Sequence, residues 1–267
     1  MADTATAIRA PADVKHGDFT VSDGVRIHYM EAGKGTPVVL LHGYTSSCDA
    51  GWFSNGIAEE LAKTHRVIGI DARGHGRSEK PHDPDKYAGD SMARDVTEVL
   101  DHLGVKRAHI HGYSMGGGIV AHMLARWPER FITAGFGGSG VREDNEEAAK
   151  KAAELDPKGV DTQQDAARAV LLNRPDRDSV ALEAVTKGRQ AKPSTAPPLD
   201  LTKIDFPVLA VNGEFDAPYS KTVRMHRELK NFTNVVVPGR AHNSMTIPGY
   251  APQAYVDAIA KFVRANS

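Results

Sequence analysis

Short apolar runs alternate with helix-like segments along most of the 267-residue chain. Runs of this kind, without polar alternation, are typical of strands that are buried on both faces of a parallel sheet. The order of strands and helices therefore predicts an α/β fold with a mostly parallel central sheet and helices on both faces. The expected strands span residues 37–41, 67–70, 108–112, 131–136, 206–212 and 234–237, after a hairpin at 19–31. The expected helices span residues 92–103, 114–127, 220–229 and 252–264.

Residues 141–198 interrupt this alternation. They are rich in Ala, Lys, Glu and Asp, contain no strand pattern, and end in a proline-rich return at 193–198. We expect several short helices that form a small cap insertion over the carboxyl edge of the sheet, where ligands bind in open α/β sheets. The expected organisation is a core made of residues 1–140 and 199–267, with the helical cap at 141–198. Any substrate-facing residues of the cap are expected among its apolar ones, such as Leu155, Val170, Leu171, Leu172, Leu182 and Val185.

Composition narrows the classes of function. The 33 Lys and Arg residues nearly balance the 34 Asp and Glu residues, which gives no support for nucleic-acid or anionic-membrane binding. No stretch approaches the roughly 18 apolar residues of a membrane span, and the N-terminal sequence lacks a signal-peptide core, so we expect a cytoplasmic protein. Cys48 is the only cysteine, and no metal-ligand spacing is visible, so we expect neither a metal nor a cofactor. Nothing in the sequence indicates an oligomeric state.

Ser114 stands between Gly112 and Gly116 in the stretch IHGYSMGGG at 110–118. A serine on a tight strand-to-helix turn needs neighbours without side chains, because a Cβ two residues away would collide across the turn. Such a turn exposes the hydroxyl at the sheet edge. It also brings the next backbone N–H, that of Met115, to a helix start, where it can bind an oxyanion.

Five stretches make the chain similar, over nearly its whole length, to the α/β-hydrolase family. They are LLHGYTSS at 40–47, DARGHGRS at 71–78, GYSMGG at 112–117, VNGEFD at 211–216 and PGRAHN at 238–243, in the family's order. The resemblance implies an α/β-hydrolase fold and a catalytic triad with Ser114 as nucleophile, Asp216 as acid and His242 as base.

The residues themselves favour the same base and acid. His242 is one of twelve histidines, but it lies in a Pro-Gly loop after an expected strand and completes the chain order Ser…Asp…His. Asp216 follows the expected strand at 206–212, with a helix cap as its alternative role. Glu214 and Asp144 remain alternative acids.

Other motif residues have expected roles around this triad. The loop that begins with His42 should supply a second oxyanion donor, the backbone N–H of Tyr44, beside that of Met115. The side chain of Tyr44 is expected to line the acyl pocket. His111 is expected to be a core residue and His75 a structural loop residue. The polar side chains of DARGHGRS, namely Asp71, Arg73 and Ser78, are expected to tie loops together.

The predicted function is therefore a serine esterase that cleaves carboxylic esters of small or medium size through an acyl-enzyme. Epoxide hydrolases and haloalkane dehalogenases of this family use an aspartate nucleophile, so Ser114 argues against both. Cofactor-free perhydrolases or haloperoxidases and carbon–carbon-bond hydrolases keep the serine triad and remain alternatives. A small-molecule receptor built on the same fold is a further alternative.

Overall fold

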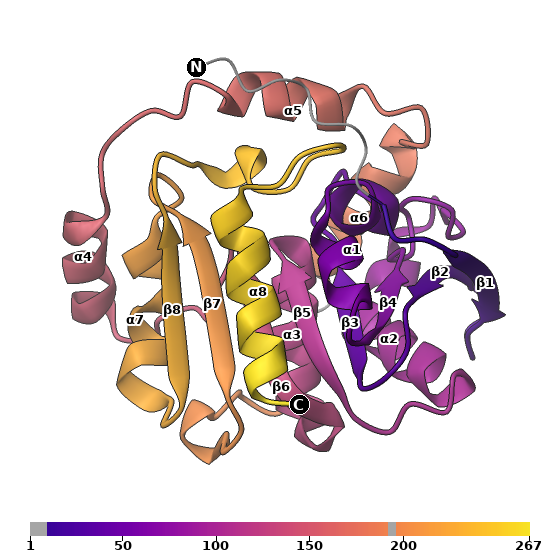
Figure 1. Ribbon diagram of the computed structural model, residues 1–267, viewed down its shortest axis with the longest axis horizontal. Helices are drawn as coiled ribbons and strands as arrows, with labels where there is room; N and C mark the ends of the chain where they lie inside the picture. Colours follow the sequence, from indigo (N-terminus) through magenta and orange to yellow (C-terminus); the bar gives the residue numbers. More distant parts are fainter. Residues whose placement is uncertain (1–9, 192–195) are drawn as a thin grey trace.

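The computed structural model describes residues 10–191 and 196–267, which form a single eight-stranded sheet with helices on both sides (Figure 1). The strand order is β1-β2-β4-β3-β5-β6-β7-β8. The strands β1 and β2 are antiparallel to each other, β2 is antiparallel to β4, and all other neighbours are parallel. The predicted α/β-hydrolase fold class is therefore confirmed. The strands are β1 (Lys15–Thr20), β2 (Arg26–Ala32), β3 (Pro37–Leu41), β4 (Arg66–Ile70), β5 (Ala108–Tyr113), β6 (Phe131–Gly137), β7 (Val208–Gly213) and β8 (Phe232–Val237).

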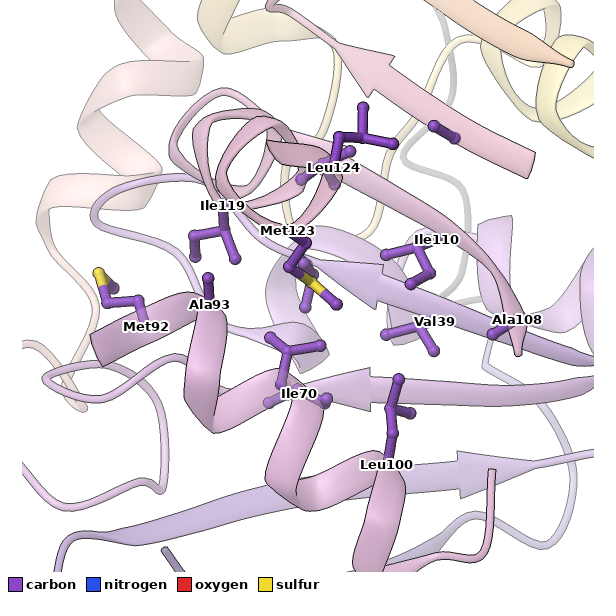
Figure 2. Close-up of a cluster of buried hydrophobic side chains, with 14 of the residues drawn as sticks. Val39, Ile70, Met92, Ala93, Leu100, Ala108, Ile110, Ile119, Met123 and Leu124 are labelled. Carbon is purple, nitrogen blue, oxygen red and sulfur yellow. The ribbon is translucent and has the colours of Figure 1, made fainter. Parts of the chain in front are cut away.

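One face of the sheet is covered by α2 (Ser91–His102), α3 (Met115–Arg126) and α7 (Pro218–Glu228). Figure 2 shows how Met123 and Ile119 of α3 meet Ile110, Val39 and Ile70 of the neighbouring strands, with Leu100 of α2 completing the layer. These side chains are buried because strand and helix both present apolar residues at their own period.

The opposite face is covered by α1 (Ile57–Ala62) and α8 (Gln253–Ala265), and α8 lies in front of the sheet in Figure 1. A π-helical turn at Asp49–Phe53 also buries Trp52 and Phe53 on this side. Neither α1 nor this turn was predicted from the sequence. Both are too short for a helical period to be recognised in the sequence.

The segment between β6 and β7 contains α4 (Glu146–Leu155), α5 (Gln164–Leu172) and α6 (Ser179–Ala191). In its described part, which leaves out 192–195 of the proline-rich return, no strand occurs. Figure 1 shows α5 crossing above the edge towards which β7 and β8 point, while α4 lies beside α7. The carboxyl edge of the sheet is thus covered by this helical segment. Within the described residues, no helix combines the length and apolar character that crossing a membrane requires.

Candidate active site

Ser114 occupies a strained turn between β5 and α3. Its φ is +52°, a left-handed value that is uncommon for a residue other than glycine. A Cβ at Gly112 would lie 2.2 Å from the carbonyl carbon of Gly116, and a Cβ at Gly116 would lie 2.2 Å from the carbonyl oxygen of Leu41. The backbone N–H of Ser114 also donates a hydrogen bond to the carbonyl of Gly137 in β6, at 2.8 Å. Two glycines and one hydrogen bond to β6 therefore hold the serine at the carboxyl edge of the sheet.

The three side chains of the predicted triad meet at this edge. The Nε2 atom of His242 lies 2.9 Å from the Oγ of Ser114, and its Nδ1 lies 2.8 Å from an Oδ of Asp216. A carboxylate only accepts hydrogen bonds, so Nδ1 must carry the hydrogen and Nε2 is free to accept one from the serine hydroxyl. Asp216 follows β7 and His242 follows β8, and these strands are parallel neighbours, which explains how residues far apart in sequence converge.

The alternative acids lie elsewhere. Glu214 accepts a hydrogen bond from the backbone N–H of Gly239 at 2.8 Å. Asp144 is 61% exposed in its side chain and pairs with Arg227 at 2.9 Å. Asp216 is also not a helix cap, since Ala217 occupies the N-cap position of α7. Only Asp216, among these three acidic side chains, has a hydrogen bond with His242.

The backbone donors predicted for an oxyanion are unengaged. In the part of the chain that the structure describes, no protein group accepts a hydrogen bond from the backbone N–H of Tyr44 or Met115. The Met115 N–H is the first of α3, and such N–H groups lack a partner within their helix. Each of these amides is therefore available as a hydrogen-bond donor.

His42 fixes the loop that carries Tyr44. Its Nε2 accepts a hydrogen bond from the Ala72 N–H at 3.0 Å, and its Nδ1 donates to the carbonyl of Gly43 at 2.8 Å. Burial lowers the pKa of His42, which favours the neutral ring that this pattern requires. His42 thus joins the Tyr44 loop to the DARGHGRS loop.

The DARGHGRS loop is structural, as predicted. Arg73 is buried and makes a bidentate pair with Asp95, at 2.5 and 2.7 Å, and a further pair with Asp23. Asp71 accepts hydrogen bonds from the backbone of Cys48 and Arg77, at 2.7 and 2.8 Å. In the same loop, Ser78 donates to the Asp71 carbonyl at 2.6 Å and His75 is buried.

His111 lies in the core, as predicted. It is 4% exposed, and its Nε2 lies 2.9 Å from the hydroxyl of Tyr255. It is a buried neighbour of the site and has no contact with Ser114 or His242 among the hydrogen bonds of the described residues.

A cavity of about 30 Å³ adjoins Ser114 and His242. Its walls include Gly43 and Tyr44 from the loop after β3, Tyr113 from β5, and Leu171 from α5. Such a volume holds only a water molecule or two. An open cleft of about 550 Å³ reaches Ser114 from the other side, between α4 and the start of α7.

Among the apolar residues of the helical segment that were expected to face a substrate, Leu171 lies beside the cavity and several others lie elsewhere. Leu171 lines the cavity beside Ser114, whereas Leu155 and Val170 face solvent with 69% and 45% of their surface exposed. Val185 packs into the main core, and Leu182 is buried against the loop after β3. The helical period turns successive apolar residues to different faces, so neighbours such as Val170 and Leu171 separate.

Tyr44 lines the cavity beside Ser114, and it also contacts the helical segment. Its hydroxyl donates to the carbonyl of Leu182 in α6 at 2.9 Å. Arg174, in the loop after α5, donates to the hydroxyl of Ser47 at 2.6 Å. The helical segment therefore holds the loop that carries a predicted oxyanion donor.

Three residues at the site were missed by the sequence analysis. Tyr113 donates its hydroxyl to the His242 carbonyl at 2.5 Å, and burial raises its pKa well above the usual value. Lys221 forms an ion pair with Asp216, and Asp161 accepts hydrogen bonds from the loop around His242. Of these three residues, only Tyr113 lies within a recognised motif, the stretch GYSMGG that contains Ser114.

Within the described residues, no group of three or more His, Cys, Asp and Glu side chains is arranged to hold a metal ion. At the site itself, the imidazole of His242 lies between a hydroxyl and a carboxylate. This arrangement can transfer a proton from the hydroxyl and stabilise the resulting imidazolium.

Comparison with known proteins identifies the family. The family model described as the alpha/beta hydrolase fold matches residues 36–194, more than half of the chain, and the chain belongs to this family. A non-heme chloroperoxidase from Streptomyces lividans is 46% identical over 115 residues, 41% of this chain and 39% of the relative. Bifunctional epoxide hydrolase 2 from Mus musculus is 35% identical over 122 residues, 45% of this chain. That match spans only 21% of the mouse protein.

Solved structures resemble nearly the whole chain. A thermophilic esterase from Thermogutta terrifontis has a TM-score of 0.71 and 22% identity, over 94% of this chain and 99% of that one. A meta-cleavage product hydrolase from Pseudomonas fluorescens has a TM-score of 0.67 and 21% identity, over 94% and 98%. At these identities the likeness establishes a shared fold.

Proposed function

We propose that the chain is a serine hydrolase that cleaves carboxylic esters of small or medium size through an acyl-enzyme. In this proposal Ser114 is the nucleophile, His242 the general base and Asp216 the acid. The observation that carries it is the pair of distances at the imidazole of His242, 2.9 Å to Ser114 and 2.8 Å to Asp216. Both are hydrogen-bond distances, and they connect a nucleophile, a base and an orienting acid in the required order.

The first half of the reaction forms the acyl-enzyme. His242 takes the proton of the Ser114 hydroxyl at Nε2 while the serine oxygen attacks the ester carbonyl. The backbone N–H groups of Tyr44 and Met115 donate to the oxyanion, and each such donor typically lowers the barrier by about 3 kcal/mol. The imidazolium, stabilised by Asp216, then protonates the leaving alcohol.

The second half releases the acid. Water enters where the alcohol left and gives a proton to Nε2 of His242 while its oxygen attacks the acyl carbonyl. Collapse of this second oxyanion returns the proton to the oxygen of Ser114. No metal or cofactor takes part in either half.

Residues 141–198 act in this proposal as a cap on a core made of 1–140 and 199–267. The contacts of Leu182 with Tyr44 and of Arg174 with Ser47 support this division. Because Leu171 closes a cavity of only about 30 Å³, the cap limits the acyl group that the site admits. We therefore expect preference for short or medium acyl chains.

A screen of acyl esters of graded chain length tests the proposal. The wild-type protein should turn over at least one ester many times, and Ser114→Ala should abolish turnover while the protein stays folded. Ser139→Ala is a matched control, because Ser139 lines the adjoining cleft but, within the described residues, its hydroxyl donates a hydrogen bond only to the Gly137 carbonyl, at 3.1 Å. Near-normal turnover in Ser114→Ala, or a single labelling event without turnover in the wild type, would contradict the proposal. The latter result would favour a ligand receptor.

Perhydrolysis is a second candidate, favoured by the 46% identity to a protein named non-heme chloroperoxidase. The same acyl-enzyme would then be attacked by hydrogen peroxide in place of water and would release a peracid. Adding peroxide to the ester assay separates the two reactions, since peracid formation requires it and ester hydrolysis does not. Peracid should be absent in Ser114→Ala if both reactions share the acyl-enzyme.

A further inference from the structure

Lys221 contacts the predicted acid on the side that His242 leaves free. It lies in the first turn of α7, and its ammonium forms an ion pair with Oδ1 of Asp216, while Oδ2 is held by Nδ1 of His242. The Asp216 side chain is only 9% exposed and that of Lys221 24% exposed. The acid of the triad is therefore shared between an imidazole and a largely enclosed ammonium.

Enclosing the Lys221 ammonium disfavours its charged form, so nearby carboxylates must stabilise it. Burial lowers the pKa of Lys221, and the neighbouring charges of Asp216 and Asp156 oppose that shift. A lysine at this position is stabilised as a cation chiefly by the carboxylate that it contacts. The charged form of Lys221 therefore depends on the negative charge of Asp216.

A cation near an imidazole disfavours the protonated ring, whereas a lone carboxylate favours it. We propose that Lys221 is a positioning residue that fixes Oδ1 of Asp216 and offsets part of the negative charge that faces the imidazole of His242. This inference rests on the triad of the proposed function. It predicts that Lys221 extends activity towards acid pH.

The other titratable and charged groups near His242 and Lys221 do not pair with Asp216 in place of Lys221. Tyr113 reaches His242 from β5 as a neutral hydroxyl on its carbonyl. Asp161 bonds the backbone of Ala241 and the hydroxyl of Ser244 from the segment before α5. Arg240, two residues before His242, directs its guanidinium to Gln163 and Tyr250. Further charged groups lie around Lys221 and in the cleft between α4 and α7: Asp156, which bonds Ser220; Glu143, paired with Arg227; and Arg142 and Glu146 at the cleft wall. In the described residues, Lys221 is the one cationic side chain with an ion pair to Asp216 besides His242 itself.

The test compares Lys221→Met with Lys221→Arg. The readout is the pH at which kcat/KM falls to half of its plateau on the acid side. Loss of the positive charge in Lys221→Met should move this midpoint upward by about 0.5 to 1 pH unit, at the low end of charge effects because the Lys221 side chain is partly exposed. Lys221→Arg keeps the charge and should stay near the wild-type midpoint.

Two further variants separate charge from packing. Lys221→Gln can still donate a hydrogen bond to Asp216 but carries no charge, so it should show the same upward shift, and it serves if the methionine variant does not fold. Lys230→Met removes the same charge from an exposed position beyond the other end of α7, and its midpoint should equal that of the wild type. Thermal unfolding confirms that each variant is folded.

The rate at which a fluorophosphonate labels Ser114 is measured across the same pH range. This second readout needs no knowledge of the natural ester, so it separates a failure of the ester proposal from a failure of the Lys221 inference. An unshifted acid midpoint in folded Lys221→Met and Lys221→Gln would overturn the inference. Equal shifts in Lys221→Arg and Lys221→Met would overturn it as well, because packing would then be the cause.

Discussion

The carboxylate of Asp161 accepts a hydrogen bond from the hydroxyl of Ser244, two residues after His242. The same oxygen also accepts the backbone N–H of Ala241 at 3.0 Å, and the other oxygen accepts the N–H of Gln163 at 2.8 Å. Burial opposes the charge of Asp161, but these hydrogen bonds outweigh it and hold its pKa below the usual range. A residue of the helical segment thus holds both sides of the His242 loop.

The first prediction is that Asp161→Asn impairs the site. The amide nitrogen of asparagine cannot accept hydrogen bonds, so the variant loses either the bond from Gln163 or both bonds from Ala241 and Ser244, and the bonds that remain no longer have a charged acceptor. Hydrogen bonds to charged groups contribute about 1.5–3 kcal/mol, and we expect the free energy of unfolding to fall by roughly that amount. The value of kcat should fall more than that of KM changes, because the His242 loop loses its anchor.

Asp165→Asn is the matched control for this prediction. It removes the same charge from an exposed position in the first turn of α5. Urea unfolding and steady-state kinetics should leave Asp165→Asn close to the wild type. Equal behaviour of the two variants would show that Asp161 has no special part in holding the loop.

The second prediction concerns substrate size. Leu171→Ala removes a side chain that lines the cavity beside Ser114, so longer acyl chains should be admitted. The ratio of kcat/KM for a medium to a short acyl ester should rise, by up to about tenfold for one or two added methylenes. Val170→Ala is the control, because Val170 is 45% exposed on the outer face of the same helix and should leave the ratio unchanged. A preference that moves equally in both variants would place the limit on acyl length elsewhere.

The third prediction concerns the turn that presents Ser114. Gly116→Ala would force a Cβ to within 2.2 Å of the Leu41 carbonyl oxygen, a backbone atom that cannot move independently of β3. We expect a loss of roughly 3 kcal/mol or more in the free energy of unfolding, with a matching loss of activity. Gly118→Ala is the control in the same helix, where the new Cβ would meet only the end of Arg189 at 3.5 Å. Since alanine is favoured over glycine in a helix by about 1 kcal/mol, this variant should unfold at higher urea concentration than the wild type.

The parts of the fold and site that could be predicted are those that depend on local sequence patterns. Continuous apolar runs predicted the parallel strands. The glycines around Ser114 predicted its turn, because a side chain at Gly112 or Gly116 would collide with the backbone there. The meeting of Ser114, Asp216 and His242 was predicted by motif order together with the rule that carboxyl ends of parallel strands share an edge.

The contacts of Lys221 and Asp161 could not be predicted in this way. Lys221 is one lysine among the polar residues of an amphipathic helix, and nothing local distinguishes it from Lys230. Asp161 lies in a loop of the helical segment whose docking depends on tertiary packing. The same reason accounts for Leu155 and Val170, whose apolar character suggested a cavity wall although the orientation of their helices turns them to solvent.

The last prediction concerns stability in acid. Burial lowers the pKa of His111 to about 3, whereas a histidine in the unfolded chain titrates near 6.5. Below about pH 6.5 the unfolded state therefore binds a proton that the folded state does not, so the free energy of unfolding falls as the pH falls, by up to about 1.4 kcal/mol per pH unit. Burial also lowers the pKa of His75 to about 3 and that of His109 to about 4, so these residues should add to the effect for the same reason.

His111→Gln removes one of these groups, so the stability difference between wild type and variant should shrink by about 2 kcal/mol between pH 7 and 5. Tyr255→Phe removes the same 2.9 Å hydrogen bond but keeps the imidazole, and urea unfolding should give it the wild-type dependence on pH. A wild-type stability that stays constant from pH 7 to 5 would contradict the burial of neutral histidines as the source of acid sensitivity.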